Sequence, residues 1–184
     1  MRKLLFSLSL CIGISLSLNA QMVSLNPGDV FSNFSLKTTN GTQYDLRAQK
    51  NVKGFILVFM TPSCDHCRAY ESRVMALDKK YKPKGYPIVA IGPYGDYPDQ
   101  YPLDALPEMK KLAIKERFTF PYVSDSQFKY TTLFGVSKTP TAIVLQKKPN
   151  GFLIIYRGDI DDEMDIKKQP KHKFVEEQVN KLVK

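Results

Sequence analysis

The feature that most constrains this chain is an apolar run that leads directly into an amphipathic segment. Residues 55–60 carry no polar side chain, which is typical of a strand buried on both faces of a sheet. After Thr61-Pro62-Ser63, apolar residues recur every three or four positions from 64 to 81. This spacing predicts a helix with one buried stripe. A buried strand followed at once by such a helix indicates an α/β fold.

The rest of the chain continues the alternation of strands and helices. Further strands are expected at 34–37, 43–46, 88–91, 121–123, 141–146 and 152–156, and further helices at 106–117, 127–134 and 174–182. The first two and the last two of these strands should form hairpins. The order predicts a mixed central sheet flanked by helices on both faces, with a long proline-rich loop at 92–107 inserted after the second core strand.

The first 20 residues have the layout of a secretory signal peptide. Arg2 and Lys3 precede an apolar run, and the small residue Ala20 stands where a signal peptidase would cut. The run is about 15 residues long, shorter than the roughly 20 that a spanning helix needs. We therefore expect a signal peptide at 1–20 and one folded domain at 25–184. An uncleaved N-terminal anchor is the alternative.

Export would place the domain in the periplasm or outside the cell, where paired cysteines can oxidise. No stretch after the signal peptide is apolar enough to span a bilayer. The net charge is +9, and lysines gather in the last 18 residues around the C-terminal helix. This helix is either a solvated basic face or a docking surface for an acidic partner or membrane. No nucleic-acid motif is present, and we expect no nucleic-acid partner.

The chemistry centres on Cys64-Asp65-His66-Cys67, which follows the buried strand and opens the helix. The free N–H groups and the dipole at a helix N-terminus stabilise a thiolate there. Cys64 is therefore expected to be the exposed nucleophile. Cys67, one turn later, can close a disulfide with Cys64 and expel a bound partner.

Other uses of the two cysteines fit the sequence less well. A structural disulfide across so short a loop adds little stability. A zinc site needs four ligands, and His172 is the one histidine outside the motif. Haem attachment needs a histidine directly after the second cysteine, where this chain has Arg68. We expect no metal and no cofactor other than the redox-active Cys64–Cys67 pair.

Two further segments bear on a site near the cysteines. Thr139-Pro140 stands just before the strand expected at 141–146. Combined with the upstream cysteine motif, it predicts a cis proline that brings the Thr139 backbone beside Cys64, where it can bind a peptide substrate. The aspartates of the long loop, at 96, 99 and 104, fit no calcium-binding pattern, and we expect them to lie in a solvated polar loop.

These segments together resemble the thioredoxin superfamily. The strand, cysteine pair and helix, the Thr139-Pro140 pair and the closing residues 156–162 are similar to the redoxin branch, which includes alkyl hydroperoxide reductase/thiol-specific antioxidant and TlpA-like proteins. The resemblance spans residues 27–162 and implies a thioredoxin-like fold. It also implies dithiol–disulfide exchange with protein or small-molecule thiols, and an upstream redox partner.

The departures from this family are informative. Thioredoxins usually carry tryptophan before the first cysteine and a buried aspartate in the preceding strand, where this chain has Ser63 and Val58. Peroxiredoxins carry a proline where Leu57 stands. The peroxidase motif is therefore incomplete, and disulfide exchange is the favoured activity. A thiol peroxidase and a non-catalytic thioredoxin-fold binding module are the alternatives.

The two residues between the cysteines are candidates for tuning the redox potential. A histidine before the second cysteine is similar to the arrangement in strongly oxidising DsbA-type proteins, which implies that His66 stabilises the Cys64 thiolate. Asp65 adds an opposing charge. Alternatively, both side chains face solvent and have little effect.

Overall fold

The computed structural model describes residues 24–165 and 167–184. The expected signal peptide lies outside the described residues. The eight strands are β1 (Val30–Phe31), β2 (Ser35–Thr38), β3 (Gln43–Asp45), β4 (Gly54–Phe59), β5 (Ile88–Gly92), β6 (Tyr122–Ser124), β7 (Thr141–Lys148) and β8 (Gly151–Gly158). The α-helices are α1 (Asp65–Tyr81), α2 (Leu106–Lys115), α3 (Lys129–Leu133) and α4 (Phe174–Leu182).

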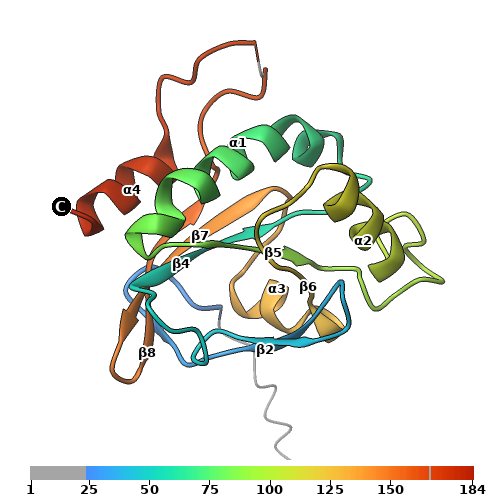
Figure 1. The fold of residues 1–184 in the computed structure, drawn as a ribbon, viewed down its shortest axis with the longest axis horizontal. Coiled ribbons are helices and arrows are strands. Elements are labelled where there is room, and N and C mark those ends of the chain that lie inside the picture. The colour runs from blue at the N-terminus through green and yellow to red at the C-terminus, as the bar shows by residue number, and fades with distance from the viewer. Residues whose placement is uncertain (1–23, 166) are drawn as a thin grey trace, which may run out of the picture.

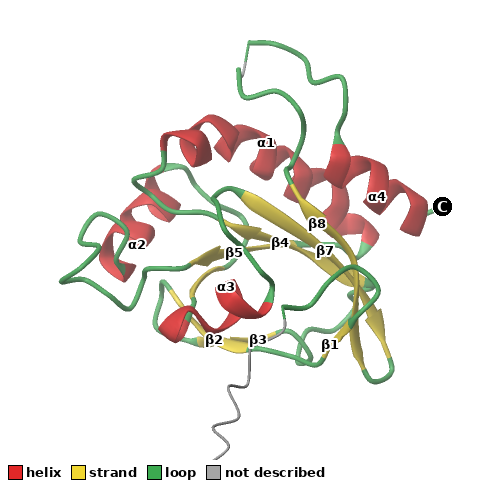
Figure 2. Cartoon of the chain, turned by 180° about the vertical axis from the view of Figure 1, so that it is seen from behind, coloured by secondary structure: helices red, strands yellow, loops and turns green. Residues whose placement is uncertain are grey.

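The strands form one mixed sheet in the order β1-β8-β7-β4-β5-β6-β2-β3. β4 lies in the middle, pairing parallel with β5 and antiparallel with β7. All six residues of β4 are buried, as the uninterrupted apolar run predicts. Both expected hairpins are present, as β2–β3 and β7–β8. Figure 2 shows the sheet with helices on its two sides.

The two faces of the sheet carry separate hydrophobic cores. On one face, α1, α2 and α4 pack through residues such as Val74, Met109 and Val179. On the other face, α3 packs through Tyr130, and Phe134 directly after the helix joins the same core. Figure 1 shows α1 and α4 side by side above the sheet, with α3 below it. The expected fold, a thioredoxin-like mixed sheet with helices on both faces, is confirmed.

Two elements differ from the sequence prediction. β1 was not expected, because a strand of two residues is too short to show alternation; it pairs with β8 through Val30 and Phe31. The helix expected at 127–134 begins at Lys129 instead. Gln127 and Phe128 have φ of 57° and 54°, and this left-handed conformation cannot continue an α-helix.

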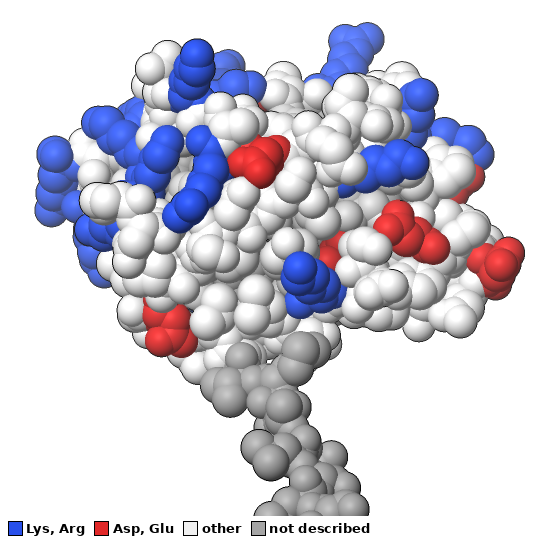
Figure 3. Space-filling model, turned by 90° about the horizontal axis from the view of Figure 1, so that it is seen from below, with Lys and Arg blue, Asp and Glu red and all other residues white. Residues whose placement is uncertain are grey.

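Charged side chains are unevenly distributed over the surface. In Figure 3, lysine and arginine side chains gather on the left of the face shown. In Figure 1, this end of the molecule carries α4 and the C-terminal end of α1. α4 is also part of the hydrophobic core, because Val175 and Val179 are fully buried. None of the helices within the described ranges is long and apolar enough to cross a bilayer.

Candidate active site around Cys64 and Cys67

The cysteine motif lies at the start of α1, after the short connection from β4. Cys64 is the N-cap residue of α1, with an extended backbone conformation (φ −77°, ψ 113°). Its Sγ accepts a hydrogen bond from the backbone N–H of Cys67 at 3.1 Å. A sulfur in this position receives one of the free N–H groups at the helix start and lies at the positive end of the helix dipole. Both cysteines are free thiols in this structure.

The two thiols differ in access to solvent. Cys64 is half-buried, less open than the sequence predicts, whereas Cys67 is only 1% exposed. Burial, and secondly its hydrogen bond with Cys64, raises the pKa of the Cys67 thiol to about 12. Cys67 is therefore a protonated thiol at neutral pH, and Cys64 is the sulfur that a partner molecule can reach.

Thr139 and Pro140 complete the site from a distant part of the chain. The Thr139–Pro140 peptide bond is cis, as the sequence predicts. The thiol of Cys64 donates a hydrogen bond to the Thr139 carbonyl at 3.4 Å. The two segments meet because β7 pairs with β4, with Thr141 opposite Phe59 in the register. Both Thr139 and Pro140 are half-buried, so this edge of the site is partly open to a substrate.

Asp65 and His66 both lie on the exposed side of the first helical turn. Asp65 forms an ion pair with Arg68, a partner that the sequence analysis did not consider. His66 lines a cavity of about 180 Å³ together with Lys138, Pro140 and Asp159. The Cys64 sulfur itself is hydrogen-bonded to backbone groups, the N–H of Cys67 and the carbonyl of Thr139. The tuning roles of Asp65 and His66 remain predictions.

Asp104 is a part of the site that sequence reasoning missed. Its side chain is 7% exposed, and its two carboxylate oxygens accept hydrogen bonds from the backbone N–H and the hydroxyl of Ser63, each at 2.8 Å. The expectation of a solvated loop is wrong at this position, although Asp96 and Asp99 are exposed. The loop folds back over the start of α1, and no local sequence signal marks this contact.

The same loop brings aromatic side chains to the site. Tyr94 stacks on Tyr101, with ring centroids 4.2 Å apart. Burial raises the pKa of the Tyr94 hydroxyl, and the negative charges of nearby groups, Cys64 among them, add to the rise. Phe128 packs its ring 4.7 Å from that of Tyr97 and 5.6 Å from that of Tyr94. These contacts explain why Phe128 is held in a left-handed conformation, which is unfavourable for a bulky residue.

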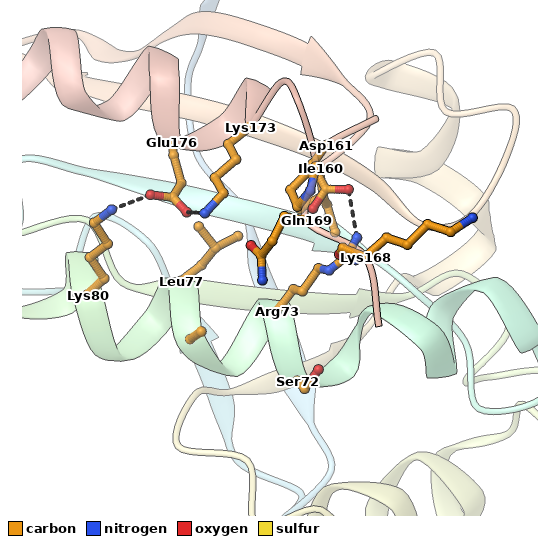
Figure 4. Close-up of a pocket in the computed structure, with 12 residues that line it drawn as sticks. Ser72, Arg73, Leu77, Lys80, Ile160, Asp161, Lys168, Gln169, Lys173 and Glu176 are labelled. Carbon is orange, nitrogen blue, oxygen red and sulfur yellow. Dashed lines mark hydrogen bonds and ion pairs between the residues drawn. The ribbon is translucent and has the colours of Figure 1, made fainter. Parts of the chain in front are cut away.

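A larger cavity, of about 330 Å³, lies on the outer side of α1, away from the cysteines. Figure 4 shows it between α1, the segment that follows β8, and α4. Arg73 pairs with Asp161 at 2.8 Å on one side of this cavity. Glu176 pairs with Lys80 and Lys173 on another. Within the described residues, no group of three or more His, Cys, Asp or Glu side chains could hold a metal ion.

A thioredoxin-like sheet with a CxxC pair at the start of α1 and a cis proline beside it defines a class of thiol-dependent oxidoreductases. Residues 27–162 match the AhpC/TSA family, and the chain belongs to that family. It is thus a member of the redoxin branch of the thioredoxin superfamily. No curated protein sequence matches the chain.

Solved structures from several bacteria share the fold. An uncharacterized conserved protein from Geobacillus kaustophilus is 25% identical, with a TM-score of 0.67 over 75% of this chain and 71% of that one. A putative thiol:disulfide interchange protein DsbE from Chlorobium tepidum is 21% identical, with a TM-score of 0.65 over 88% of this chain and 100% of that one. Peroxidoxin BcpB from Mycobacterium tuberculosis is 20% identical, with a TM-score of 0.60 over 76% and 88%.

Proposed function

We propose that this protein is an exported thiol–disulfide oxidoreductase that works through the Cys64–Cys67 pair. The observation that carries the proposal is the difference between the two sulfurs. Cys64 is half-buried at a helix N-terminus, whereas Cys67 is 1% exposed and donates its backbone N–H to the Cys64 sulfur. One sulfur can meet a substrate, and the other can reach only the first sulfur.

The proposed reaction proceeds in two exchanges. The Cys64 thiolate attacks one sulfur of a substrate disulfide, forming a mixed disulfide and releasing the other substrate sulfur as a thiolate that takes up a proton. The Cys67 sulfur then attacks Cys64 Sγ, and the second substrate thiol leaves. The substrate gains two electrons and two protons, and the protein retains a Cys64–Cys67 disulfide. The reverse sequence oxidises a dithiol substrate.

The edge formed by Thr139 and Pro140 is proposed to hold the substrate backbone next to Cys64. It stands directly before β7 and is half-buried, so an extended peptide could lie along it. Substrates of the proposed reaction are protein or small-molecule thiols and disulfides, and an upstream redox partner resets the pair. The exported location is supported by the signal-peptide layout of residues 1–20.

A hydroperoxide reductase is the second candidate, and the match to the AhpC/TSA family favours it. In that reaction the Cys64 thiolate attacks the peroxide O–O bond, becomes a sulfenic acid and releases an alcohol or water. Cys67 then attacks the sulfenic sulfur, which forms the disulfide and releases one molecule of water. Against this candidate, Leu57 stands where the peroxiredoxin motif has a proline.

Two assays on the same protein separate these activities. For disulfide exchange, we expect the protein to accelerate reduction of insulin by dithiothreitol, and Cys64→Ser to abolish the acceleration. Ser35→Ala, an exposed change on β2, is the control. Consumption of cumene hydroperoxide without insulin reduction would favour the peroxidase, and inactivity in both assays would favour a binding module. Mass spectrometry of the mature protein tests loss of residues 1–20.

A further inference from the structure

Three neighbouring elements, β4, α1 and β7, run between the same two ends of the molecule. β4 runs from Gly54 toward the cysteine motif, and α1 runs back from the motif for 17 residues. β7 pairs antiparallel with β4, with Thr141 opposite Phe59 and Gln146 opposite Gly54, so it too runs away from Cys64. At 1.5 Å per residue, α1 separates the two ends by about 25 Å.

The end that lies far from Cys64 is rich in lysine. Exposed lysines precede β4, close α1, belong to the short turn Lys82–Lys84 that follows α1, and end β7. We call six of them the distal lysines: Lys50, Lys53, Lys79, Lys82, Lys84 and Lys147. Figure 3 shows lysine and arginine side chains gathered at the end of the molecule where α1 finishes.

Contacts between these segments join the distal lysines into one surface. The backbone N–H of Lys53 donates a hydrogen bond to the carbonyl of Gly85, directly after the turn, at 2.8 Å. The backbone N–H of Lys147 donates to the carbonyl of Lys53, also at 2.8 Å. Lys50 and Lys82 line the same cavity of about 350 Å³. Lysines from four segments of the chain therefore face one side of the molecule.

Little negative charge opposes these lysines. Among the distal lysines, Lys82 alone forms an ion pair within the described part of the chain, at 3.7 Å from Asp78, whose side chain is only 1% exposed. Glu176 of α4, at the edge of this surface, already pairs with Lys80 and Lys173. The surface therefore presents uncompensated positive charge and contributes much of the net charge of +9.

The chemistry of this surface fits a bilayer better than a protein partner. A lysine ammonium is a mobile, hydrated point charge, whereas the planar fork of arginine suits carboxylates held in a fixed geometry. Lysines are attracted to anionic headgroups without a fixed geometry. An open hollow of about 500 Å³ between Lys79 and Lys82 is lined in part by Met75 and Pro83. Apolar side chains beside cations are suited to the headgroup boundary of a membrane.

We propose that the distal lysines dock this protein on an anionic phospholipid bilayer, with Cys64 facing away from it. The lysines meet the lipid phosphates, and Met75 and Pro83 lie at the level of the headgroups. α1 then holds the active site about 25 Å from the lipid, where Cys64 stays open to molecules in solution. This inference goes beyond the proposed function, because docking requires neither cysteine.

The first test is sedimentation of the whole protein with vesicles. One set of vesicles contains equal parts of phosphatidylglycerol and phosphatidylcholine, and the other contains phosphatidylcholine alone. We expect binding to the anionic set only, and release in about 1 M salt, where the Debye length falls to about 3 Å. Equal binding to both sets would overturn the proposal, because it would show apolar anchoring instead of charge attraction.

Substitution of the distal lysines tests whether this surface carries the binding. The triple variant Lys50→Gln, Lys79→Gln and Lys84→Gln removes three exposed charges. Because each lysine near an anionic surface strengthens binding by about fivefold, the triple variant should bind the anionic vesicles about 100-fold more weakly.

A matched triple variant controls for net charge. Lys37→Gln, Lys110→Gln and Lys129→Gln remove three exposed lysines from β2, α2 and α3. Lys129 lies over the ring of Tyr130 at 5.3 Å, much as Lys84 lies over that of Tyr81 at 5.4 Å. This variant should lose less than about fivefold in affinity. Equal losses in the two triple variants would overturn the role of the distal lysines.

Chemical labelling tests the orientation. On anionic vesicles, acetylation of Lys79 and Lys84 by a water-soluble reagent should slow, while iodoacetamide should label Cys64 at the rate seen in solution. Protection of Cys64 by the vesicles would overturn the orientation. Binding to poly-glutamate without binding to anionic vesicles would also overturn the proposal, in favour of an acidic protein partner.

Discussion

The carbonyl of Thr139 lies 3.4 Å from the sulfur of Cys64, across a sequence separation of 75 residues. The contact exists because β7 and β4 are neighbouring strands whose register places Thr141 opposite Phe59. Cys64 therefore has two different neighbours, a helix N-terminus on its own segment and a backbone carbonyl from a distant one. Any molecule that reaches this sulfur also meets the edge before β7.

The first prediction concerns the order in which the cysteines react. A thiol with a pKa of about 12, as for Cys67, is a thiolate in roughly 1 molecule in 100,000 at pH 7. Because only thiolates react readily and Cys67 is buried, we expect iodoacetamide to label Cys64 at least about 100-fold faster. Peptide mass spectrometry after limited labelling measures this ratio.

Substitutions of the same pair extend that test. Cys67→Ser should accumulate mixed disulfides with substrate proteins, because nothing remains to resolve them, and Cys64→Ser should accumulate none. Non-reducing gels of the two variants compare them directly. Preferential labelling of Cys67 would reverse the proposed roles.

The second prediction concerns His66. A charge-assisted contact that stabilises the Cys64 thiolate would contribute roughly 1.5 to 3 kcal/mol, which corresponds to roughly 30 to 60 mV for a two-electron couple. We therefore expect His66→Pro to lower the reduction potential by that amount, measured by equilibration with glutathione. An unchanged potential would show that His66 is a solvent-facing residue.

The third prediction concerns Asp65, whose charge is opposed by Arg68 in the same turn. Asp65→Ala should raise the potential, because it removes a negative charge and leaves Arg68 unpaired near the thiolate. The rise in reduction potential caused by Asp65→Ala should be smaller in a protein that already carries Arg68→Gln. The same glutathione equilibration of the single and double variants measures this coupling; equal shifts in both backgrounds would contradict it.

The fourth prediction concerns the two hydrogen bonds between Asp104 and Ser63. Asp104→Ala removes a buried carboxylate that accepts two hydrogen bonds at 2.8 Å, and should lower the free energy of unfolding by about 2 kcal/mol. Urea denaturation measures the loss. Asp99→Ala, an exposed aspartate in the same loop, should change it by less than about 0.5 kcal/mol. Equal effects of the two substitutions would mean that the loop is not held by Asp104.

The fifth prediction concerns the pH dependence of stability through Glu71. Its folded-state pKa is raised by burial, so the folded state binds this proton more tightly than the unfolded state does. The stabilisation is complete below the unfolded pKa, which is about 4.3 for glutamate, and is lost as the pH rises through the folded pKa. Glu71→Gln should therefore raise the melting temperature at pH 8 and change it little near pH 4. Thermal melts across this range check the sign, and a variant less stable at pH 8 would contradict it.

The elements with strong local patterns could be predicted from the sequence. The run at 55–60, the stripe from Cys67 to Tyr81 and the valines of the last helix each show a period that identifies the element and its buried face. Short or irregular elements could not. β1 has two residues, and the start of α3 depends on Phe128 packing between Tyr94 and Tyr97, residues about thirty positions away.

The same division holds for the site. Cys64, Cys67, Thr139 and Pro140 were identifiable from the sequence, because the thiol spacing and the proline before a strand are local motifs with a chemical meaning. Asp104 and Glu71 were not, since an aspartate in a polar loop and a glutamate in a helix are ordinary on a surface. Only the folding of the 93–105 loop over the start of α1, and the tertiary packing around α1, left Asp104 7% and Glu71 8% exposed. Burial depends on which segments meet in space. Tertiary structure alone therefore decided that Asp104 is hydrogen-bonded, and that Oε1 of Glu71 has no partner within the described part of the chain.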